Sequence, residues 1–259
     1  MFPIAAGVID PRSPGGRPAS WAATGRSGGI SPAPYDSLNL AGYVGDADAS
    51  VAENRRRLAG VLGLAGGRVA VMDSVHGAVV AVVNGPGVVA GVDGLLTQEP
   101  DLAIVALGAD CVPIVLVGDD DRTVAVAHCG WRGLVADVLG AVVAAMADVG
   151  SGVERVILGP AVCGSCYPVP PERAREVSDA WPGPVSRAAL VTCADGQPGI
   201  DVRRGAAARL VDLGVAPEAV TSAGGCTVED AGLFSYRRDG ITGRQGVAAC
   251  RHGLARMGA

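Results

Sequence analysis

The sequence has few of the features that nucleic-acid-binding and membrane proteins need. Its formal net charge is −5 and only 3% of its 259 residues are aromatic, whereas a nucleic-acid surface needs a basic stripe and usually aromatic stacking platforms. Its longer apolar runs, such as residues 112–117, have the length of a strand and fall well short of the roughly 20 residues that a membrane helix needs. We therefore expect no nucleic-acid partner and no membrane partner, and small-molecule chemistry is favoured.

Lysine is also absent, and we expect neither a leader segment nor a disulfide framework. All 21 basic residues are arginine, which indicates a GC-rich coding genome and carries no mechanistic meaning. Residues 1–11 lack a cationic region and a sustained apolar stretch, so we expect no secretory signal. The seven cysteines are odd in number and have no small-scaffold spacing, as in proteins of a reducing compartment. We expect a cytoplasmic protein that is a monomer or a homodimer.

The hydrophobic content of 49% is enough for a chain of this length to bury a full core. No repeat or linker divides it, so we expect a single domain over residues 1–259 with an irregular Pro-, Gly- and Ser-rich N-terminal segment, about residues 1–37. Interspersed hairpins and helices predict an α+β fold with mixed sheets. Strands are expected at residues 69–72, 79–83, 102–107, 112–117, 123–127 and 153–158. Helices are expected at residues 51–62, 134–149, 173–180 and 205–213.

The most informative residues are two of the three histidines and one cysteine. His76 in Ser-Val-His-Gly, Cys111 in Gly-Ala-Asp-Cys and His128 in His-Cys-Gly-Trp-Arg-Gly stand among turn-forming residues at the ends of apolar runs. Histidine and cysteine are the side chains that bind a borderline-soft metal or perform nucleophilic catalysis near neutral pH. Three unrelated core residues would rarely all lie beside turn-forming residues, so we expect the chemistry at this trio.

The connector Gly118–Asp121 between two expected strands decides whether Cys111 and His128 meet. If these four residues form the loop, Cys111 faces His128 across the ladder, with Cβ atoms about 5 Å apart on one face. A five-residue loop shifts the register by one, so that Cys111 faces Cys129 and His128 points to the other side. The first register predicts a pair that one metal ion could bridge.

The role of His76 depends on which residues lie near it in the fold. Local geometry does not place it, and an isolated histidine beside glycine usually has a structural role. Together with Cys111 and His128 it would supply three ligands to zinc and leave a fourth position open for water or substrate, as in catalytic sites. Asp93 and Asp110 are candidate acids or bases, although a turn or a cap explains each equally well.

The segment after His128 has the features of an anion site. Free backbone N–H groups precede the expected helix and Arg132 adds a guanidinium, a combination that favours phosphate. Alternatively, Arg132 merely caps the fold or forms a salt bridge. Arg237, Arg238 and Arg244 could form a further anion surface, although exposed arginines usually serve only solubility.

One cysteine pair has a plainer explanation. Cys163-Gly-Ser-Cys166 has the spacing of a metal knuckle or a redox motif. No second pair follows and no thioredoxin-like context precedes it, so structural thiols are favoured.

These residues lie in motifs that resemble those of the YfiH family, also called laccase-domain or polyphenol-oxidase-like proteins and peptidoglycan editing factors. The resemblance covers nearly the whole chain, and several separate motifs follow in the family's order. The motifs are Arg26-Ser-Gly-Gly-Ile-Ser31, Tyr35-Asp-Ser-Leu-Asn-Leu40, Glu53-Asn-Arg55, Val75-His-Gly77, Asp93-Gly94, Ala109-Asp-Cys-Val-Pro113, His128-Cys-Gly-Trp-Arg-Gly133, Gly159-Pro160, Cys226-Thr227, Phe234-Ser-Tyr-Arg-Arg238 and Thr242-Gly-Arg-Gln245.

The resemblance implies a fold, a cofactor and an activity. The fold would be a four-layer α/β/β/α sandwich, with a zinc site at the residues that match His76, Cys111 and His128. The activity would be that of a purine nucleoside phosphorylase, which cleaves adenosine, inosine, guanosine or methylthioadenosine with phosphate and also deaminates adenosine. The candidate residues are Cys111, His128 and Asp110 for catalysis, and Arg26, Asn39 and Arg132 for contacts to phosphate and ribose.

Two departures from the family pattern and three rival functions complete the expectations. Ser74 stands where the family usually has Gln, and Tyr43 where it often has His, so base preference or metal choice could differ. One rival is a cysteine hydrolase of a peptidoglycan-type amide, with Cys111 as nucleophile and His128 as base. Another is copper-dependent phenol oxidation, which we disfavour because three histidines are too few for a multi-copper cluster. The third is a zinc-stabilised binding module, whose fourth metal position the protein itself would fill.

Overall fold

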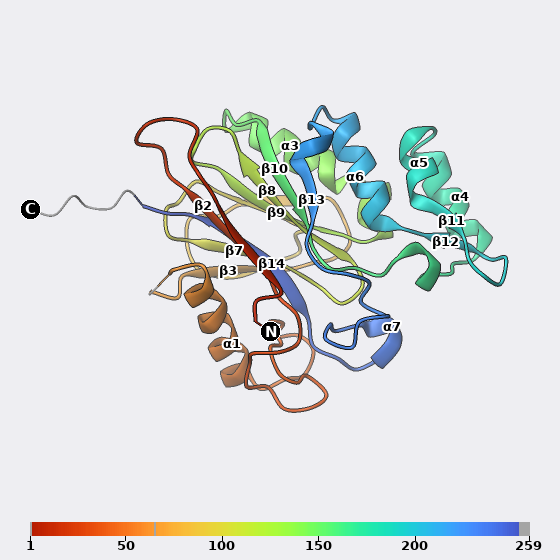
Figure 1. The fold of residues 1–259 in the computed structure, drawn as a ribbon, viewed down its shortest axis with the longest axis horizontal. Helices are drawn as coiled ribbons and strands as arrows, with labels where there is room; N and C mark the ends of the chain where they lie inside the picture. Colours follow the sequence, from red (N-terminus) through yellow and green to blue (C-terminus); the bar gives the residue numbers. More distant parts are fainter. Residues whose placement is uncertain (1, 65, 254–259) are drawn as a thin grey trace, which may run out of the picture.

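Two six-stranded mixed sheets packed face to face form the centre of the protein in a computed structural model, which describes residues 2–64 and 66–253 (Figure 1). The first sheet has the order β1 (Ala5–Ile9), β2 (Ala19–Ala23), β14 (Gln245–Arg251), β7 (Ala103–Gly108), β3 (Val69–Asp73), β5 (Gly87–Ala90). The second has the order β13 (Val220–Ser222), β10 (Val153–Leu158), β8 (Val112–Gly118), β9 (Val124–Cys129), β6 (Gly94–Thr97), β4 (Val80–Val82). A small two-stranded sheet joins β11 (Leu190–Thr192) to β12 (Pro198–Ile200).

Seven α-helices lie among the described residues. They are α1 (Asp48–Val61), α2 (Trp131–Val135), α3 (Val138–Asp148), α4 (Pro171–Ala180), α5 (Pro184–Ala189), α6 (Val202–Asp212) and α7 (Tyr236–Asp239). Of these, α1 and α3 pack on the outer faces of the two large sheets. Figure 1 shows α1 on one side of the strands and α3 and α6 on the other. Leu58 of α1 and Val105 of the first sheet belong to one core cluster, and Val142 of α3 belongs to the core cluster of the second sheet. The expected four-layer α/β/β/α sandwich is confirmed.

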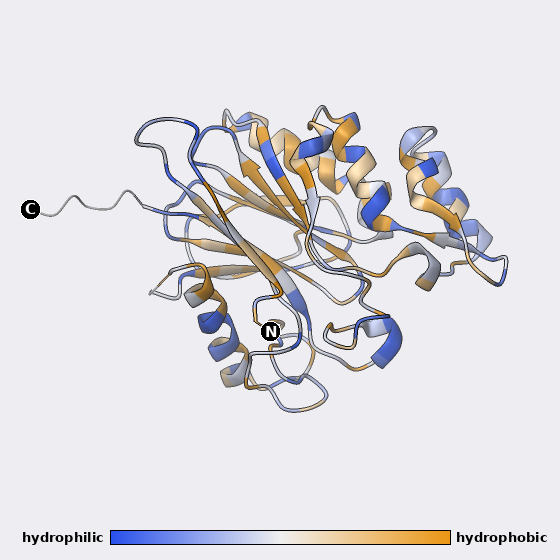
Figure 2. Ribbon diagram, viewed as in Figure 1, coloured by the Kyte–Doolittle hydropathy of each residue, from blue (hydrophilic) through white to orange (hydrophobic). Residues whose placement is uncertain are grey.

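The strands of the second sheet are apolar throughout because both of their faces are buried. Along β8, Val115 and Val117 belong to the core between the sheets, whereas Ile114 and Leu116 belong to the core under the helices. This alternation is the two-residue period of a strand. Figure 2 shows the same pattern, with apolar residues concentrated on the strands and on the helix faces that cover them.

Most expected elements are present, with shifted ends, and two expectations are wrong. The N-terminal segment is not irregular throughout, since β1 and β2 pair with each other and β2 also pairs with β14. The helix expected at residues 134–149 is two helices, because Asp137 adopts a left-handed φ of 60° and caps α3 by accepting a hydrogen bond from the Gly140 N–H. Within the described ranges, no helix has both the length and the apolar character needed to cross a bilayer.

Candidate active site

Cys111 and His128 lie at the ends of neighbouring strands, on the face of the second sheet that looks toward the first. Cys111 immediately precedes β8, and His128 is the penultimate residue of β9. His128 has the same strand parity as Val126, which belongs to the core between the sheets. The apolar packing between the sheets therefore ends at these two side chains.

The hairpin register differs from both expected registers. The structure pairs Pro113 with His128, because the loop is residues 119–122 and is closed by a 2.9 Å hydrogen bond from the Gly118 N–H to the Thr123 carbonyl. The direct Cys111–His128 pairing is thus wrong by two residues. Since side chains alternate with a period of two, both residues still point to one face, as diagonal neighbours.

His76 reaches the pair from the turn that follows β3. Its φ is 63°, a conformation that needs support in a residue other than glycine. The fully buried Asp93 carboxylate supplies it by accepting the N–H groups of His76 at 2.9 Å and Gly77 at 2.7 Å. The same carboxylate accepts the His128 Nδ1–H at 2.9 Å, which leaves Nε2 as the ring nitrogen of His128 that is available for catalysis or metal binding. Asp93 is therefore a positioning residue for both histidines.

The three side chains converge into one group, which we call the His–Cys–His cluster (His76, Cys111, His128). One potential ligand atom from each residue lies within 4.8 Å of the others. The two imidazole rings meet edge to face, with centroids 4.8 Å apart. Gly130 makes room for this arrangement, because a Cβ atom there would lie 2.9 Å from Cys111 Sγ and 3.2 Å from His76 Cδ2.

The electrostatics of the cluster favour a thiolate. Burial works to raise the pKa of Cys111, but the charge and hydrogen bonds of His128 and His76 outweigh it and lower the pKa of Cys111 to about 6. Burial works to lower the pKa of His128, but the thiolate and the Asp93 carboxylate raise the pKa of His128 to about 9. Both shifts arise mainly from one thiolate–imidazolium attraction. The thiolate is the form of cysteine that binds metals and attacks electrophiles.

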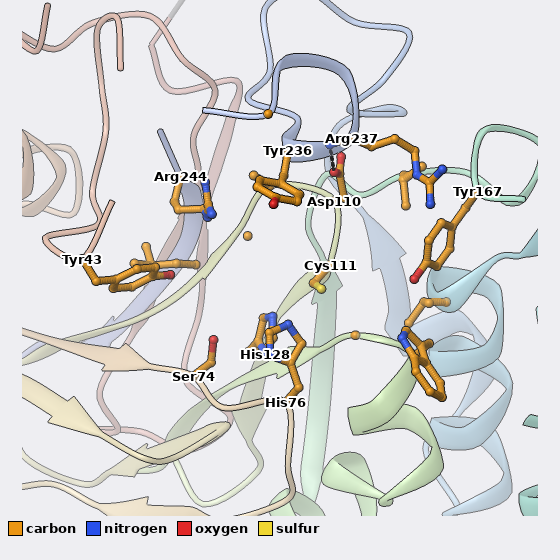
Figure 3. Close-up of a pocket in the computed structure, with 18 of the residues that line it drawn as sticks. Tyr43, Ser74, His76, Asp110, Cys111, His128, Tyr167, Tyr236, Arg237 and Arg244 are labelled. Atoms are coloured by element: carbon orange, nitrogen blue, oxygen red, sulfur yellow. Dashed lines mark hydrogen bonds between the residues drawn. The ribbon is translucent and has the colours of Figure 1, made fainter. Parts of the chain in front are cut away.

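A cavity of about 650 Å³ opens over the cluster (Figure 3). This volume lies in the range of small-molecule sites, about 300–1,000 Å³. Figure 3 shows Tyr43, Tyr236 and Arg244 on one side of Cys111, and Tyr167 and Arg237 on the other. The charged and aromatic lining residues outside the cluster are Tyr43, Asp110, Trp131, Tyr167, Arg173, Tyr236, Arg237 and Arg244. A ligand in this cavity would meet aromatic faces and guanidinium groups together.

Among the residues that the structure describes, no carboxylate forms an ion pair with the cavity arginines (Arg173, Arg237, Arg244). Their guanidinium groups lie instead over the rings of Trp131 at 4.9 Å, Tyr167 at 4.6 Å and Tyr236 at 5.8 Å, respectively. Unpaired guanidinium groups held on aromatic faces can bind an anionic ligand.

Three residues expected to bind phosphate and ribose do not line the cavity. Arg26 pairs with Asp36 and donates to backbone carbonyls. Asn39 is fully buried, and its Oδ1 accepts the backbone N–H of Arg244 at 2.9 Å. Arg132 is exposed, with its guanidinium over the Trp131 ring at 4.9 Å. The structure therefore does not bring these side chains to the candidate site, although Asn39 positions the backbone of a residue that is there.

Asp110 lines the cavity, but its carboxylate is occupied. Oδ1 accepts the hydroxyl groups of Thr227 at 2.6 Å and Ser235 at 2.7 Å, and Oδ2 accepts the Arg237 N–H at 2.7 Å. These bonds join the loop before Cys111 to Thr227 and to the start of α7. The geometry gives Asp110 a positioning role, whereas the sequence suggested a catalytic one.

Several cavity residues carry no local sequence signal. Trp131, Arg237 and Arg244 are not among them, because Trp131 lies in the motif of His128 and the two arginines belong to the anion surface that the sequence suggests. Arg238, the third arginine of that surface, donates instead to the carbonyls of residues 227, 228, 230 and 233. Tyr167 and Arg173 come from a separate part of the chain, next to and within α4. Only the fold brings them to the cluster.

Comparison with known proteins gives consistent results for sequence and fold. The sequence profile of the family described as multi-copper polyphenol oxidoreductase laccase matches residues 20–252. A protein from Streptomyces griseus named purine nucleoside phosphorylase is 44% identical over 232 residues, which cover 87% of this chain and 92% of that protein. A protein with the same name from Corynebacterium glutamicum is 37% identical and covers 92% of this chain and 95% of its own length.

Two solved structures have the same fold over nearly their whole length. The crystal structure of YlmD from Geobacillus stearothermophilus has a TM-score of 0.83 and 30% identity, covering 95% of this chain and 99% of that one. The crystal structure of YfiH from Bacillus licheniformis has a TM-score of 0.81 and covers 92% of this chain and 97% of that one. At 24% identity, the second likeness concerns the fold alone.

Proposed function

The chain belongs to the multi-copper polyphenol oxidoreductase laccase family, also known as the YfiH family, and from this premise we propose that it is a zinc-dependent purine nucleoside phosphorylase. The observation that carries the proposal is one cavity that holds a His–Cys–His cluster, unpaired arginines and aromatic faces. The names of the relatives from S. griseus and C. glutamicum support the same activity. Phosphate and a purine nucleoside are the reactants.

The cavity arginines are the residues that we assign to phosphate. Phosphate binds guanidinium groups through charge-assisted, often bidentate hydrogen bonds. Arg244 is the best positioned, because its backbone is fixed by Asn39 and its Nη1 already donates to the Thr242 carbonyl at 2.9 Å. Oriented by these groups, a phosphate oxygen would attack C1′ of the ribose while the bond from C1′ to the base breaks. The products would be ribose 1-phosphate and the free base.

The aromatic residues of the cavity are assigned to the nucleoside. A purine has two apolar faces, which aromatic side chains contact well. Tyr43 and Tyr236 lie on one side of the cavity and Tyr167 on the other (Figure 3). Adenosine, inosine, guanosine and methylthioadenosine share the purine ring and differ at its edge or at the ribose 5′ position. We propose all four as substrates and adenosine deamination as a second activity.

The His–Cys–His cluster has the donor chemistry of a zinc site. Two imidazole nitrogens and one thiolate sulfur, all within 4.8 Å, provide three ligands of the kinds that Zn²⁺ prefers and leave a fourth position open. The His128 Nδ1–H donates to the Asp93 carboxylate, and a hydrogen bond of this kind usually orients a histidine that binds a metal through its other nitrogen. When bound, the ion would supply Lewis acidity next to the substrate. His76, Cys111 and His128 would hold it.

One observation favours the cysteine hydrolase as a second candidate. Asp93, His128 and Cys111 form a carboxylate–imidazole–thiol series, which is the order of orienting group, base and nucleophile in cysteine hydrolases. That series explains Cys111 and His128 but gives no role to His76, which also approaches the thiol. Metal content separates the two candidates, because zinc bound through Cys111 would occupy the nucleophile.

Copper-dependent phenol oxidation receives little support from the histidine content. The sequence contains three histidines, and His252 is hydrogen-bonded to the Ser20 hydroxyl at 2.7 Å and is not among the cavity residues. A multi-copper oxidase cluster needs many more imidazole ligands. We therefore propose zinc as the metal.

The test is phosphorolysis by purified protein of known metal content. Adenosine is incubated with and without phosphate, and adenine, inosine and ribose 1-phosphate are followed by chromatography. We expect base release that requires phosphate and falls at least about 100-fold in His76→Ala and Cys111→Ala. His252→Ala and Cys250→Ala are matched controls with the same substitutions outside the cavity. Base release unaffected by the first two changes would contradict the site, and metal-free protein trapped covalently at Cys111 by an electrophile would favour the hydrolase.

A further inference from the structure

A second group of metal-ligating side chains lies apart from the His–Cys–His cluster. Cys163 and Cys166 belong to the turn that follows β10, and Cys226 and Glu229 belong to the segment after β13. A parallel β-bridge between Ala161 and Cys226 brings these segments together. One potential ligand atom from each of the four residues lies within 4.8 Å of the others. We call them the Cys–Glu cluster.

The sulfur–oxygen separations in the Cys–Glu cluster are close to those around a tetrahedral ion. Zinc bonds of about 2.3 Å to sulfur and about 2.0 Å to oxygen place a thiolate sulfur and a carboxylate oxygen about 3.5 Å apart. Glu229 Oε1 lies 3.4 Å from Cys166 Sγ and 3.8 Å from Cys163 Sγ. The Cys163 N–H donates to Cys226 Sγ at 3.3 Å, a contact that orients and stabilises a ligating thiolate. The side chains are thus preorganised for one ion.

We propose that the Cys–Glu cluster binds one Zn²⁺ ion as a structural site. Three thiolates and one carboxylate fill a tetrahedral shell and leave no position for water or substrate, unlike the three ligands of the His–Cys–His cluster. Thiolates select zinc over magnesium and calcium, which prefer oxygen ligands. The sequence pattern Cys163-Gly-Ser-Cys166 supplied only half of this ligand set, and the fold supplies the other half from residues 226 and 229.

The ion would join a segment that lines the cavity to a segment that supports it from behind. Val162 and Tyr167, which flank the cysteines of the first segment, line the cavity. Thr227, next to Cys226, donates to Asp110 at 2.6 Å. The second site would therefore stabilise the wall and the loop of Asp110 without contacting substrate, and it does not depend on which reaction the cavity performs.

Metal stoichiometry tests the second site independently of activity. The full-length protein is purified, treated to remove loosely bound metal and measured by inductively coupled plasma mass spectrometry. We expect two zinc ions per chain in the wild type, one in His76→Ala/Cys111→Ala and one in Cys163→Ser/Cys226→Ser. Glu229→Gln should bind the second ion more weakly, whereas Glu172→Gln, an exposed glutamate of α4, and Cys250→Ala should keep two ions.

The proposal is overturned if His76→Ala/Cys111→Ala protein contains no zinc, or if Cys163→Ser/Cys226→Ser protein retains as much as the wild type. Cobalt substitution of the wild type keeps the test decisive if a variant fails to fold. We expect two Co²⁺ ions per chain, with sulfur-to-cobalt charge-transfer absorption from about four thiolates in total, three from this cluster and one from Cys111. Charge-transfer absorption from a single thiolate would refute the second site. If Cys163 and Cys166 are found as a disulfide, failure of the Cys–Glu cluster to bind cobalt after reduction would also refute it. Loss of the second ion with phosphorolysis intact would leave the proposed function standing.

Discussion

Replacing Asp93 by asparagine should weaken both the fold and the metal site. Asp93 is fully buried, and its carboxylate accepts the N–H groups of His76 and Gly77 and the Nδ1–H of His128. Asparagine has one accepting oxygen instead of two. If that oxygen keeps the bonds to His76 and His128, its amino group faces the N–H of Gly77, and a buried donor loses its acceptor.

The cost follows from these bonds. An unsatisfied buried N–H costs about 1–3 kcal/mol, and changing the charge-assisted bond to His128 into a neutral one costs about 1 kcal/mol more. The free energy of unfolding should fall by about 2–4 kcal/mol, which for a chain of this size lowers Tm by roughly 5–15 °C. Metal affinity should fall about 10–100-fold, as it does when a carboxylate that orients a metal-binding histidine is removed.

Two measurements check this prediction. Thermal unfolding followed by circular dichroism gives Tm for metal-free protein, and competition with a chromophoric chelator gives the metal Kd. Asp195→Asn is the matched control, because this aspartate is exposed and its Oδ1 accepts only the Gln197 N–H. An Asp93→Asn protein with the Tm and metal affinity of Asp195→Asn would refute the positioning role.

Three further predictions concern the cluster, the phosphate site and acid stability. Gly130→Ala should lower metal affinity at least about 10-fold, because the new Cβ would displace the Cys111 thiol from ligand distance. Arg244→Gln should raise KM for phosphate about 10–100-fold, the equivalent of one or two charge-assisted hydrogen bonds. Burial works to raise the pKa of Asp121, but hydrogen bonds from residues 12 and 13 hold the pKa below its usual value. The stability that Asp121 contributes is present above about pH 4 and lost as the pH falls through the lowered pKa, so in urea unfolding Asp121→Asn should differ from wild type at pH 7 and less at pH 3.

Each of these predictions has a control and a contradicting outcome. Gly60→Ala places a methyl group in open space on α1, and equal metal affinities of the two alanine variants would contradict the steric argument. Arg175→Gln removes an exposed arginine of α4 that pairs with Glu172, and it should leave the KM for phosphate unchanged. A pH-independent difference between Asp121→Asn and wild type would show that the carboxylate charge is not what stabilises the fold.

The sequence predicts best the elements whose local pattern decides their structure. β7, β8 and β9 are continuously apolar because both faces are covered, and α1 has one apolar face. β1 and β2 lie among Pro, Gly and Ser residues, and β2 is stabilised by β14 from the other end of the chain. No local pattern reports that pairing, so this part of the sheet could not be predicted.

The site residues also fall into those whose role the sequence predicts and those whose role it does not. His76, Cys111 and His128 stand out in the sequence because their chemistry is rare in this chain, and the fold does bring them together. Arg26 and Asn39 also belong to motifs, but the structure uses them to hold backbone, and Asn39 fixes the segment that carries Arg244. Membership of a motif indicates that a residue contributes to the region of the site. It does not distinguish a residue that contacts the ligand from one that holds the backbone in place.

The relation between Cys111 and His128 depends on the turn at the far end of their hairpin. Both faces of β8 and β9 are apolar, so burial alone would tolerate a slip by one residue, which would turn one of the two side chains to the opposite face. Asp120 prevents this slip by accepting the N–H groups of Arg122 at 3.1 Å and Thr123 at 2.8 Å and the Thr123 hydroxyl at 2.7 Å, which fixes the loop at residues 119–122. A slip by two residues moves a side chain by roughly 7 Å along the same face, within reach of a diagonal neighbour. The turn at Asp120 therefore keeps the side chains of Cys111 and His128 on the same face of the sheet. Sharing that face matters more than being direct cross-strand partners, because it allows a thiol and an imidazole from adjacent strands to meet.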